Sequence, residues 1–202
     1  CFGLDTVDYS NKGYFFDYDK DGELDMLLLN HNPNSLPVSG VPKTKVLLKE
    51  DQPLTGLRLY EQRERYCYDV TAKKNINGSS LSYGLGIALS DFNNDGWIDF
   101  YVSNDYTIPD YLYINNKSGD FENKLQESMS LTSHFSMGND TSDINNDGHI
   151  DLMTLDMLPE DNKRQKLLQA PDNYNLFDLN IKSGFHFQYM RNMLQINNGN
   201  GT

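Results

Sequence analysis

Apolar residues along this chain occur in short runs whose length and composition favour β-strands. Residues 86–90 form a short apolar stretch, and residues 98–103 are rich in β-branched and aromatic side chains. Residues 26–29 form an uninterrupted apolar run of the kind that fits a buried strand. No run approaches the ~18 residues that a membrane-spanning helix needs. The pattern therefore predicts an all-β fold without a transmembrane segment.

The predicted strands repeat in three similar units. In each unit, two strands flank an Asp-rich loop, and a third strand and a turn follow. The third strands are predicted at residues 57–60, 111–115 and 192–197, and fourth strands at residues 66–70 and 120–123. Units of about four antiparallel strands and ~40–50 residues are typical of propeller blades.

We therefore expect residues 1–202 to form part of one β-propeller with about three blades. The expected blades span residues 10–72, 80–126 and 133–202, and the last blade lacks its final strand. Because three blades cannot close a ring and would leave open edges, we expect the rest of the propeller to come from the same parent chain or from a partner.

Two insertions interrupt the repeat, at residues 30–50 and 158–190. The first is rich in Pro and is interpreted as an exposed loop. In the second, residues 159–170 predict one short helix, because Pro159 suits a first helical turn and Pro171 ends the helix. Long loops on a rigid scaffold often carry binding surfaces, although a loop that only covers the scaffold edge remains the alternative.

The three loops share the pattern D-x-[DN]-x-D-G-x-[IL]-D. They span residues 17–25, 91–99 and 143–151, and we call them loops 1, 2 and 3. Oxygen side chains at positions 1, 3, 5 and 9 of the pattern can converge on one hard cation, and position 7 can add its backbone carbonyl. The glycine at position 6 permits the sharp turn. The pattern predicts calcium, and a turn without metal is the alternative.

An EF-hand begins in the same way but differs at its end. It needs a bidentate Glu at position 12 and a helix on each side. Position 12 here is Leu28, Val102 or Thr154, and the flanking residues favour strands. The pattern therefore predicts a hairpin whose tip folds around a cation.

Charge supports this interpretation. The net charge is −12, from 29 acidic and 17 basic residues. The ligand positions hold four carboxylates in loop 1 and three in each other loop. Without a cation, carboxylates this close repel one another by ~1–4 kcal/mol per pair. No basic stripe is present, which argues against a nucleic-acid partner.

Composition and cysteines limit the class further. Aromatic residues make up 12% of the chain, which is too many for a disordered protein. Cys1 and Cys67 could pair, stay free or be unrelated, and Cys1 could carry a lipid. No signal peptide is visible, and an export signal could lie upstream. Calcium sites of weak to moderate affinity suit extracytoplasmic space.

The repeated units resemble FG-GAP/VCBS repeats, the calcium-bearing blades of integrin-α-like β-propellers. Residues 83–105 carry this resemblance most clearly. Residues 135–140, 155–161 and 190–199 are similar to a narrower group, the propeller proteins related to cartilage acidic protein, which often carry an ASPIC/UnbV module. Many such proteins are exported by Bacteroidetes-type bacteria. Family propellers close with about seven blades, whereas this chain has about three.

The resemblance implies about three calcium ions and their ligands. The implied side-chain ligands are Asp17, Asp19, Asp21 and Asp25; Asp91, Asn93, Asp95 and Asp99; and Asp143, Asn145, Asp147 and Asp151. Glu23, Trp97 and His149 would contribute only backbone carbonyls.

We expect a non-catalytic, calcium-rigidified module that binds a protein or glycan, or that takes part in a larger surface complex. The expected location is secreted, cell-surface or periplasmic, with possible outer-membrane attachment. A propeller domain of a glycan lyase or hydrolase is the alternative, because acidic pairs abound. No Gly-x-Ser-x-Gly, His-Glu-x-x-His or phosphate-loop motif occurs. The histidines share no ligand spacing: His31, His134, His149 and His186.

Overall fold

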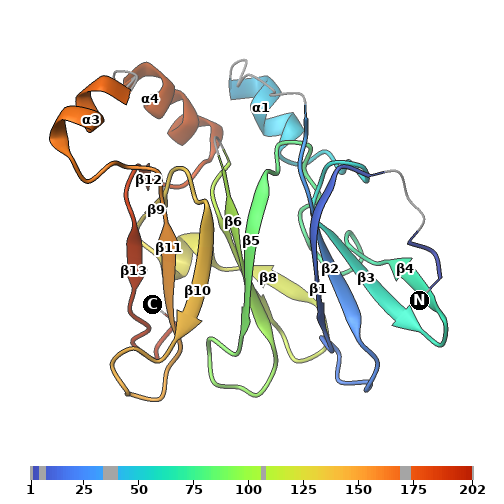
Figure 1. The fold of residues 1–202 in the computed structure, drawn as a ribbon. Coiled ribbons are helices and arrows are strands. Elements are labelled where there is room, and N and C mark those ends of the chain that lie inside the picture. Colours follow the sequence, from blue (N-terminus) through green and yellow to red (C-terminus); the bar gives the residue numbers. More distant parts are fainter. Residues whose placement is uncertain (1, 5–7, 34–40, 106–107, 169–173, 202) are drawn as a thin grey trace.

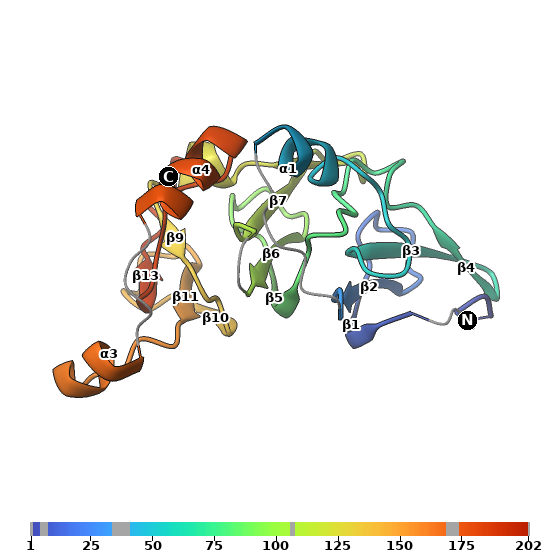
Figure 2. The same ribbon diagram turned by 90° about the horizontal axis from the view of Figure 1, so that it is seen from above.

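Three antiparallel sheets stand side by side and form an arc when seen from above (Figures 1 and 2). The computed structural model describes residues 2–4, 8–33, 41–105, 108–168 and 174–201. The mostly β fold expected from the strand pattern is confirmed, and none of the sheets closes on itself.

Each sheet follows the chain order from one strand to the next. The first sheet has the order β1 (Ser10–Phe16), β2 (Asp25–Asn30), β3 (Arg58–Arg63) and β4 (Tyr66–Asp69). The second has β5 (Gly84–Ser90), β6 (Asp99–Asn104), β7 (Tyr111–Asn115) and β8 (Phe121–Asn123). The third has β10 (Gly138–Ser142), β11 (Asp151–Leu155) and β13 (Met193–Gln195).

A short parallel pair, β9 (Thr132–Ser133) and β12 (Gln188–Tyr189), joins the segment before the third sheet to the second insertion. The chain pattern gave no sign of this pair. Two residues on each side are too few for an alternation of polar and apolar positions to show.

Helices are more numerous than expected. The single helix predicted at residues 159–170 corresponds to α3 (Asn162–Leu168), but the described residues also contain α1 (Val41–Leu47), α2 (Leu125–Ser128) and α4 (Tyr174–Ser183). The interpretation of residues 30–50 as a loop alone was therefore wrong for α1. Pro42 lies in its first turn, where its missing N–H costs nothing. Packing between α1 and α4 stabilises both helices, and local propensity does not report such packing.

Side chains between neighbouring sheets form the core. Between the first two sheets, Phe16, Phe100 and Phe121 pack among buried aliphatic residues, and the Phe100 and Phe121 ring centroids lie 4.9 Å apart. Between the second and third sheets, Tyr101 and Leu152 belong to one buried cluster. Because strand side chains alternate between faces, the second sheet contributes one face to each cluster.

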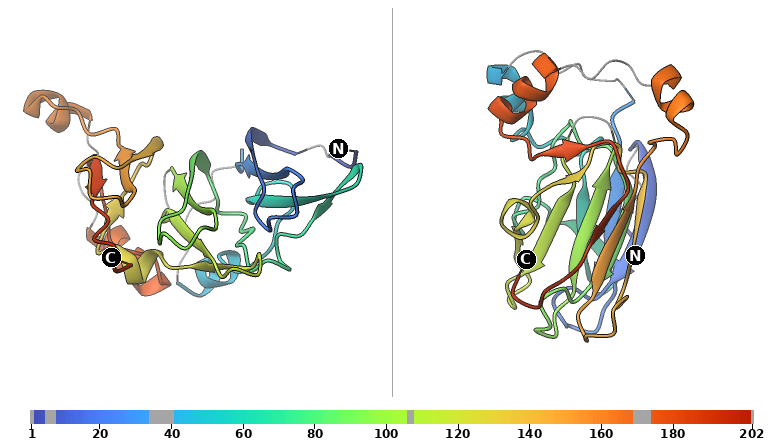
Figure 3. Two further views of the ribbon diagram at one scale, coloured as in Figure 1. Left: turned by 90° about the horizontal axis from the view of Figure 1, so that it is seen from below. Right: turned by 90° about the vertical axis from the view of Figure 1, so that its left-hand side faces the viewer.

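The two ends of the strands carry different structures, as the side view in Figure 3 shows. Loops 1, 2 and 3 lie together at one end, where each joins the first two strands of its sheet. The helices α1, α3 and α4, which belong to the two insertions, lie at the other end. None of the helices in the described ranges is long and apolar enough to cross a membrane.

The outer edge of the first sheet pairs with the N-terminal residues. Phe2 forms a parallel bridge with Tyr66, and the Cys67 N–H donates to the Phe2 carbonyl at 2.8 Å. Cys67 is disulfide-bonded, which decides between the alternatives that the sequence left open for it. Cys1 and the lipid considered for it lie outside the described residues.

Candidate metal centre

Loops 1, 2 and 3 share one backbone conformation. Position 4 and position 6 of each loop have positive φ. The values are 61° and 88° at Lys20 and Gly22, 55° and 87° at Asn94 and Gly96, and 60° and 88° at Asn146 and Gly148. Glycine and asparagine adopt this region readily, whereas lysine does so rarely. The repeated conformation brings the side chains of positions 1, 3 and 5 to the same side of the turn.

Backbone hydrogen bonds hold the acidic side chains in place. The Asp17 carboxylate accepts hydrogen bonds from the N–H groups of Asp21 and Gly22, at 3.2 and 3.0 Å. The position-5 carboxylate of Asp21 accepts one from Glu23 N–H at 2.8 Å. The corresponding bonds in loops 2 and 3 are 2.7–3.0 Å long. Each loop is thus folded by the carboxylates that the sequence suggests as ligands.

Loop 1 collects three acidic side chains at one point. Ligand oxygens of Asp17, Asp19 and Asp21 lie within 4.8 Å of one another. None of the described basic side chains forms an ion pair with them. Burial and the neighbouring Asp21 raise the pKa of Asp19, because both disfavour its negative charge. Three close carboxylates without a basic partner fit a hard divalent cation.

Loops 2 and 3 differ from loop 1 at position 3, where each has asparagine. The amide nitrogens of Asn93 and Asn145 donate to the position-5 carboxylates of Asp95 and Asp147, at 3.0 and 2.8 Å. Hydrogen bonds from His149 N–H and from the Asn145 amide lower the pKa of Asp147. These loops keep two carboxylates and one amide oxygen at positions 1, 3 and 5, which is a weaker but similar oxygen set.

The position-9 aspartates have a role that the sequence did not reveal. Asp25, Asp99 and Asp151 are fully buried. The Asp99 carboxylate accepts hydrogen bonds from the N–H groups of Phe92, in its own loop, and Asn115, at the end of the third strand, at 2.9 and 2.8 Å. Asp25 and Asp151 bind the equivalent groups. Each position-9 aspartate therefore ties its loop to the third strand of the same sheet or, for Asp151, to Asn197 just after that strand.

Burial has an electrostatic consequence at two of these sites. It raises the pKa of Asp25 and of Asp99 to about 7, against the opposing effect of their backbone hydrogen bonds. Asp25 is not one of the three carboxylates that converge in loop 1. A position-9 ligand role stays a prediction, whereas the structural role of these side chains is visible.

The position-7 side chains point to neighbouring groups and not to the converging carboxylates. Trp97 packs under Lys20, His149 contacts Asn94, and Glu23 accepts a hydrogen bond from Glu64 N–H at 3.1 Å. The contribution of the position-7 backbone carbonyls to an ion stays a prediction.

None of the four histidines belongs to a cluster of possible metal ligands in the part of the chain that the structure describes. His31 packs against Tyr83, with ring centroids 5.1 Å apart, and His134 stacks on Phe135 at 4.3 Å. Burial lowers the pKa of His186. These histidines serve packing, and His149 belongs to loop 3.

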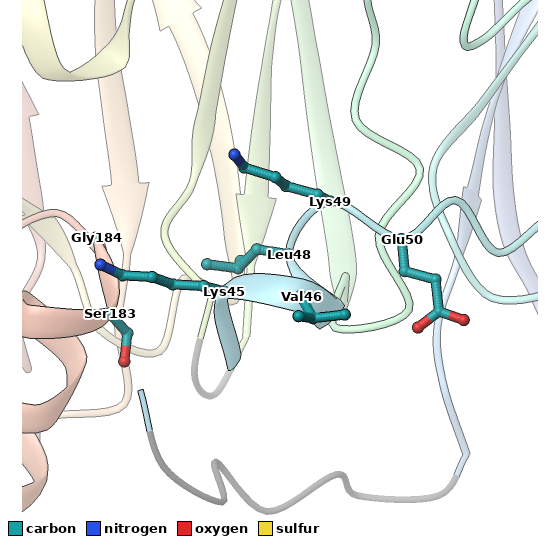
Figure 4. Close-up of a pocket in the computed structure, with 7 residues that line it drawn as sticks. All are labelled: Lys45, Val46, Leu48, Lys49, Glu50, Ser183 and Gly184. Carbon is teal, nitrogen blue, oxygen red and sulfur yellow. The ribbon is translucent and has the colours of Figure 1, made fainter. Parts of the chain in front are cut away.

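A second candidate site lies at the opposite end of the molecule, between α1 and α4. It is an open hollow of about 830 Å³. Its lining residues are Lys45, Val46, Leu48, Lys49, Glu50, Ser183 and Gly184 (Figure 4). Neither Lys45 nor Lys49 forms an ion pair with a described acidic residue. The two insertions thus combine to form a surface with both apolar and cationic groups.

Comparison with known families agrees with the repeated loops. Residues 91–154 match the family described as FG-GAP-like repeat. The matched span begins with the first residue of loop 2 and ends three residues after loop 3, so it covers both loops and the strands between them. None of the curated proteins matches the chain. The narrower grouping with an ASPIC/UnbV module stays a prediction.

Proposed function

We propose that this chain, in which residues 91–154 carry an FG-GAP-like repeat, is a non-catalytic, calcium-stabilised segment of a β-propeller. It would act outside the cytoplasm as a protein- or glycan-binding or assembly module. The observation that carries the proposal is the threefold recurrence of one loop conformation, with oxygen side chains gathered at its tip.

The chemistry of the loops favours calcium among common ions. Positions 1, 3 and 5 offer only carboxylate and amide oxygens, which suit hard cations and are poor selectors for zinc or copper. Calcium accepts six to eight oxygens in flexible geometry, whereas magnesium demands a near-ideal octahedron. When bound, the ion would neutralise the carboxylate repulsion of each loop and stabilise the folded state by mass action.

The arrangement of the sheets supports the propeller. The outer face of the third sheet exposes Met153, Leu155, Leu194 and Ile196, each between 41 and 51%. The equivalent face of the second sheet is covered by the third. We infer that a further blade, from the same parent chain or from a partner, covers the exposed face.

Binding is proposed for the end that carries the insertions. The hollow between α1 and α4 is formed by the two insertions, and its two lysines contrast with a chain of net charge −12. A protein or glycan that presents acidic groups would complement this surface. Extracytoplasmic location is supported by the disulfide of Cys67 and by the calcium that such compartments supply.

The glycan-active enzyme remains the alternative. The strongest candidate for a catalytic acid outside the loops is Asp110. Burial raises the pKa of this residue to about 7. However, Asp110 is fully buried, and its oxygens accept hydrogen bonds from Tyr101 Oη and Asn104 N–H, at 2.5 and 2.7 Å. A general acid must reach its substrate, so this carboxyl is better suited to holding the fold together.

Chelation tests the proposal. EDTA should lower the melting temperature measured by circular dichroism, and calcium added in excess should restore it, while magnesium restores it less. Isothermal titration calorimetry should then count about three calcium ions per chain. A triple variant, Asp21→Asn with Asp95→Asn and Asp147→Asn, provides the control and should no longer respond to EDTA. An unchanged melting temperature of the original chain in EDTA would contradict the structural role of calcium.

A further inference from the structure

We propose that loops 1, 2 and 3 form a coupled chain, in which an ion bound at one loop raises the calcium affinity of the next. This inference rests on the proposed calcium sites and goes beyond them. It depends on two kinds of contact between neighbouring loops, each of which occurs at both junctions. Lys20, Asn94, Asn115 and Asn197 are the positioning residues.

The first kind of contact joins loop 1 to loop 2. The Lys20 ammonium nitrogen lies 4.4 Å from the centroid of the Trp97 ring. Lys20 is position 4 of its loop, and Trp97 is position 7 of the next. A cation over an indole face is an attractive contact of electrostatic origin. The side chain of one loop therefore covers the segment that offers a carbonyl to the ion of its neighbour.

The same positions meet between loop 2 and loop 3, with different chemistry. Asn94 is position 4 of loop 2. Its amide nitrogen donates to the carbonyl of Gly148 at 3.1 Å and lies 2.9 Å from Nδ1 of His149. These two residues are positions 6 and 7 of loop 3. The contact is a cation–π interaction at one junction and a pair of polar contacts at the other, but the loop positions are the same. This recurrence indicates that the contact between position 4 and the next loop is a property of the repeat.

A second kind of contact runs in the opposite direction. Asn115 N–H donates to the position-9 carboxylate of Asp99 in loop 2 at 2.8 Å, while the Asn115 amide donates to the Tyr18 carbonyl of loop 1 at 2.9 Å. Asn197 repeats both bonds one sheet further, to Asp151 of loop 3 and to the Phe92 carbonyl of loop 2, at 2.9 and 2.7 Å. One asparagine thus touches two loops at each junction.

These contacts couple the sites because they involve the residues that an ion would order. Position 4 lies between the ligand positions 3 and 5 and has positive φ, so binding of an ion fixes its backbone. Its side chain is then held against positions 6 and 7 of the next loop. A loop that is already ordered loses less conformational entropy when its own ion binds. By linkage, the effect is the same in both directions.

Loop 3 supplies an internal control. Asn146 occupies position 4, with φ of 60°, and forms no hydrogen bond to another loop of the described chain. Asn94→Gly and Asn146→Gly are therefore the same substitution in the same backbone conformation. Glycine tolerates positive φ, so both variants can fold. Only the first variant removes a contact between loops.

Trp97 provides the measurement, because it is the only tryptophan and belongs to loop 2. Its fluorescence during a calcium titration reports ion binding at that loop. Asp147→Asn weakens the site in loop 3. We expect this change to raise the calcium concentration at the Trp97 midpoint about fivefold, the lower end of typical coupling between sites. The shift should persist with Asn146→Gly, shrink by at least half with Asn94→Gly, and vanish when Asn94→Gly is combined with Asn197→Asp.

Calorimetry on the same variants separates this inference from the proposed function. If the chain binds about three ions but Asp147→Asn leaves the Trp97 midpoint unchanged, the loops are independent and the coupling is wrong, while the calcium sites stand. If the shift is equal in the Asn94→Gly and Asn146→Gly backgrounds, the assigned contacts do not carry it. If no ion binds, both proposals fail.

Discussion

The second and third sheets are built on the same plan but differ in what covers them. Tyr101 in β6 and Met153 in β11 occupy equivalent positions two residues after the position-9 aspartate, yet they are 1 and 42% exposed. Leu112 and Leu194, their partners on the neighbouring strands, are 5 and 51% exposed. The third sheet covers Tyr101 and Leu112, which belong to the second sheet. Burial in this molecule is therefore set by the neighbouring sheet, and an apolar strand alone does not determine it.

A second difference concerns the polar side chains between the second and third strands of each sheet. In the second sheet, Asn104 N–H donates to the carboxylate of Asp110 at 2.7 Å. In the third sheet, Asp156 N–H donates to the amide oxygen of Asn192, also at 2.7 Å. The acid and the amide have exchanged places while the hydrogen bond is conserved between the sheets. The backbone requires an acceptor at this position, and either side chain supplies it.

The largest expected effect contrasts Leu112→Ala with Leu194→Ala. Loss of the buried Leu112 side chain should lower the free energy of unfolding by about 2–5 kcal/mol. The same substitution at the exposed Leu194 should change it by less than about 0.5–1 kcal/mol. Urea titrations followed by circular dichroism in excess calcium measure both. Equal losses would mean that a neighbour covers the third sheet in solution, for example in a self-associated form, which light scattering would detect.

An intermediate effect is expected within the metal loops. Asp95→Ala removes a charged ligand that also accepts the Trp97 N–H, and should cost about 1.5–3 kcal/mol in excess calcium. Asn93→Ala removes a neutral ligand and should cost about 0.5–1.5 kcal/mol. Asp147→Ala and Asn145→Ala should rank in the same order in the third sheet. Equal melting temperatures for the Asp95 and Asn93 variants would contradict this ligand assignment.

A further contrast is a pH dependence that involves the Asp110 carboxyl of the second sheet. The pKa of Asp110 is about 7 in the folded protein and near 3.8 in the unfolded chain. Since the folded state binds the proton more tightly, this group stabilises the fold below pH 3.8, and the contribution is lost as pH rises through 7. Asp110→Asn copies the amide of the third sheet. The stability of the original chain should fall more steeply than that of the variant between about pH 4 and 7.

The control for this prediction is the difference between the two proteins at each pH, measured in excess calcium. The substitution leaves loops 1, 2 and 3 unchanged, so their contribution cancels in this difference. Parallel profiles would show that the Asp110 carboxyl stays charged in the folded state.

The repeated part of the fold could be predicted from the sequence. Strands β5, β6 and β7 lie where the apolar runs placed them, because alternation and β-branched composition act locally. The backbone of the loops was equally predictable, since Gly22, Gly96 and Gly148 mark the turn. These features depend on residues close together in the chain.

The remaining features depend on residues far apart in the chain. Helix α4 is stabilised by packing on α1, more than a hundred residues earlier, and its sequence has no strong helical pattern. The sequence around Asn115 does not predict its contact with Tyr18, which lies 97 residues away. The position of Lys20 over Trp97 follows from how two sheets stand beside each other. A single sequence contains no local signal for such arrangements.

The pairing of Phe2 with β4 has a consequence for how copies of the protein behave toward one another. An uncovered outer strand would present free N–H and C=O groups, onto which a strand from another molecule could add. Here Phe2 pairs with part of that edge, and Cys67 in the edge strand is disulfide-bonded. Thiol reductants would break the disulfide and weaken the pairing of Phe2 with this edge. Storage under reducing conditions should therefore promote edge-to-edge aggregation, even when every loop remains intact.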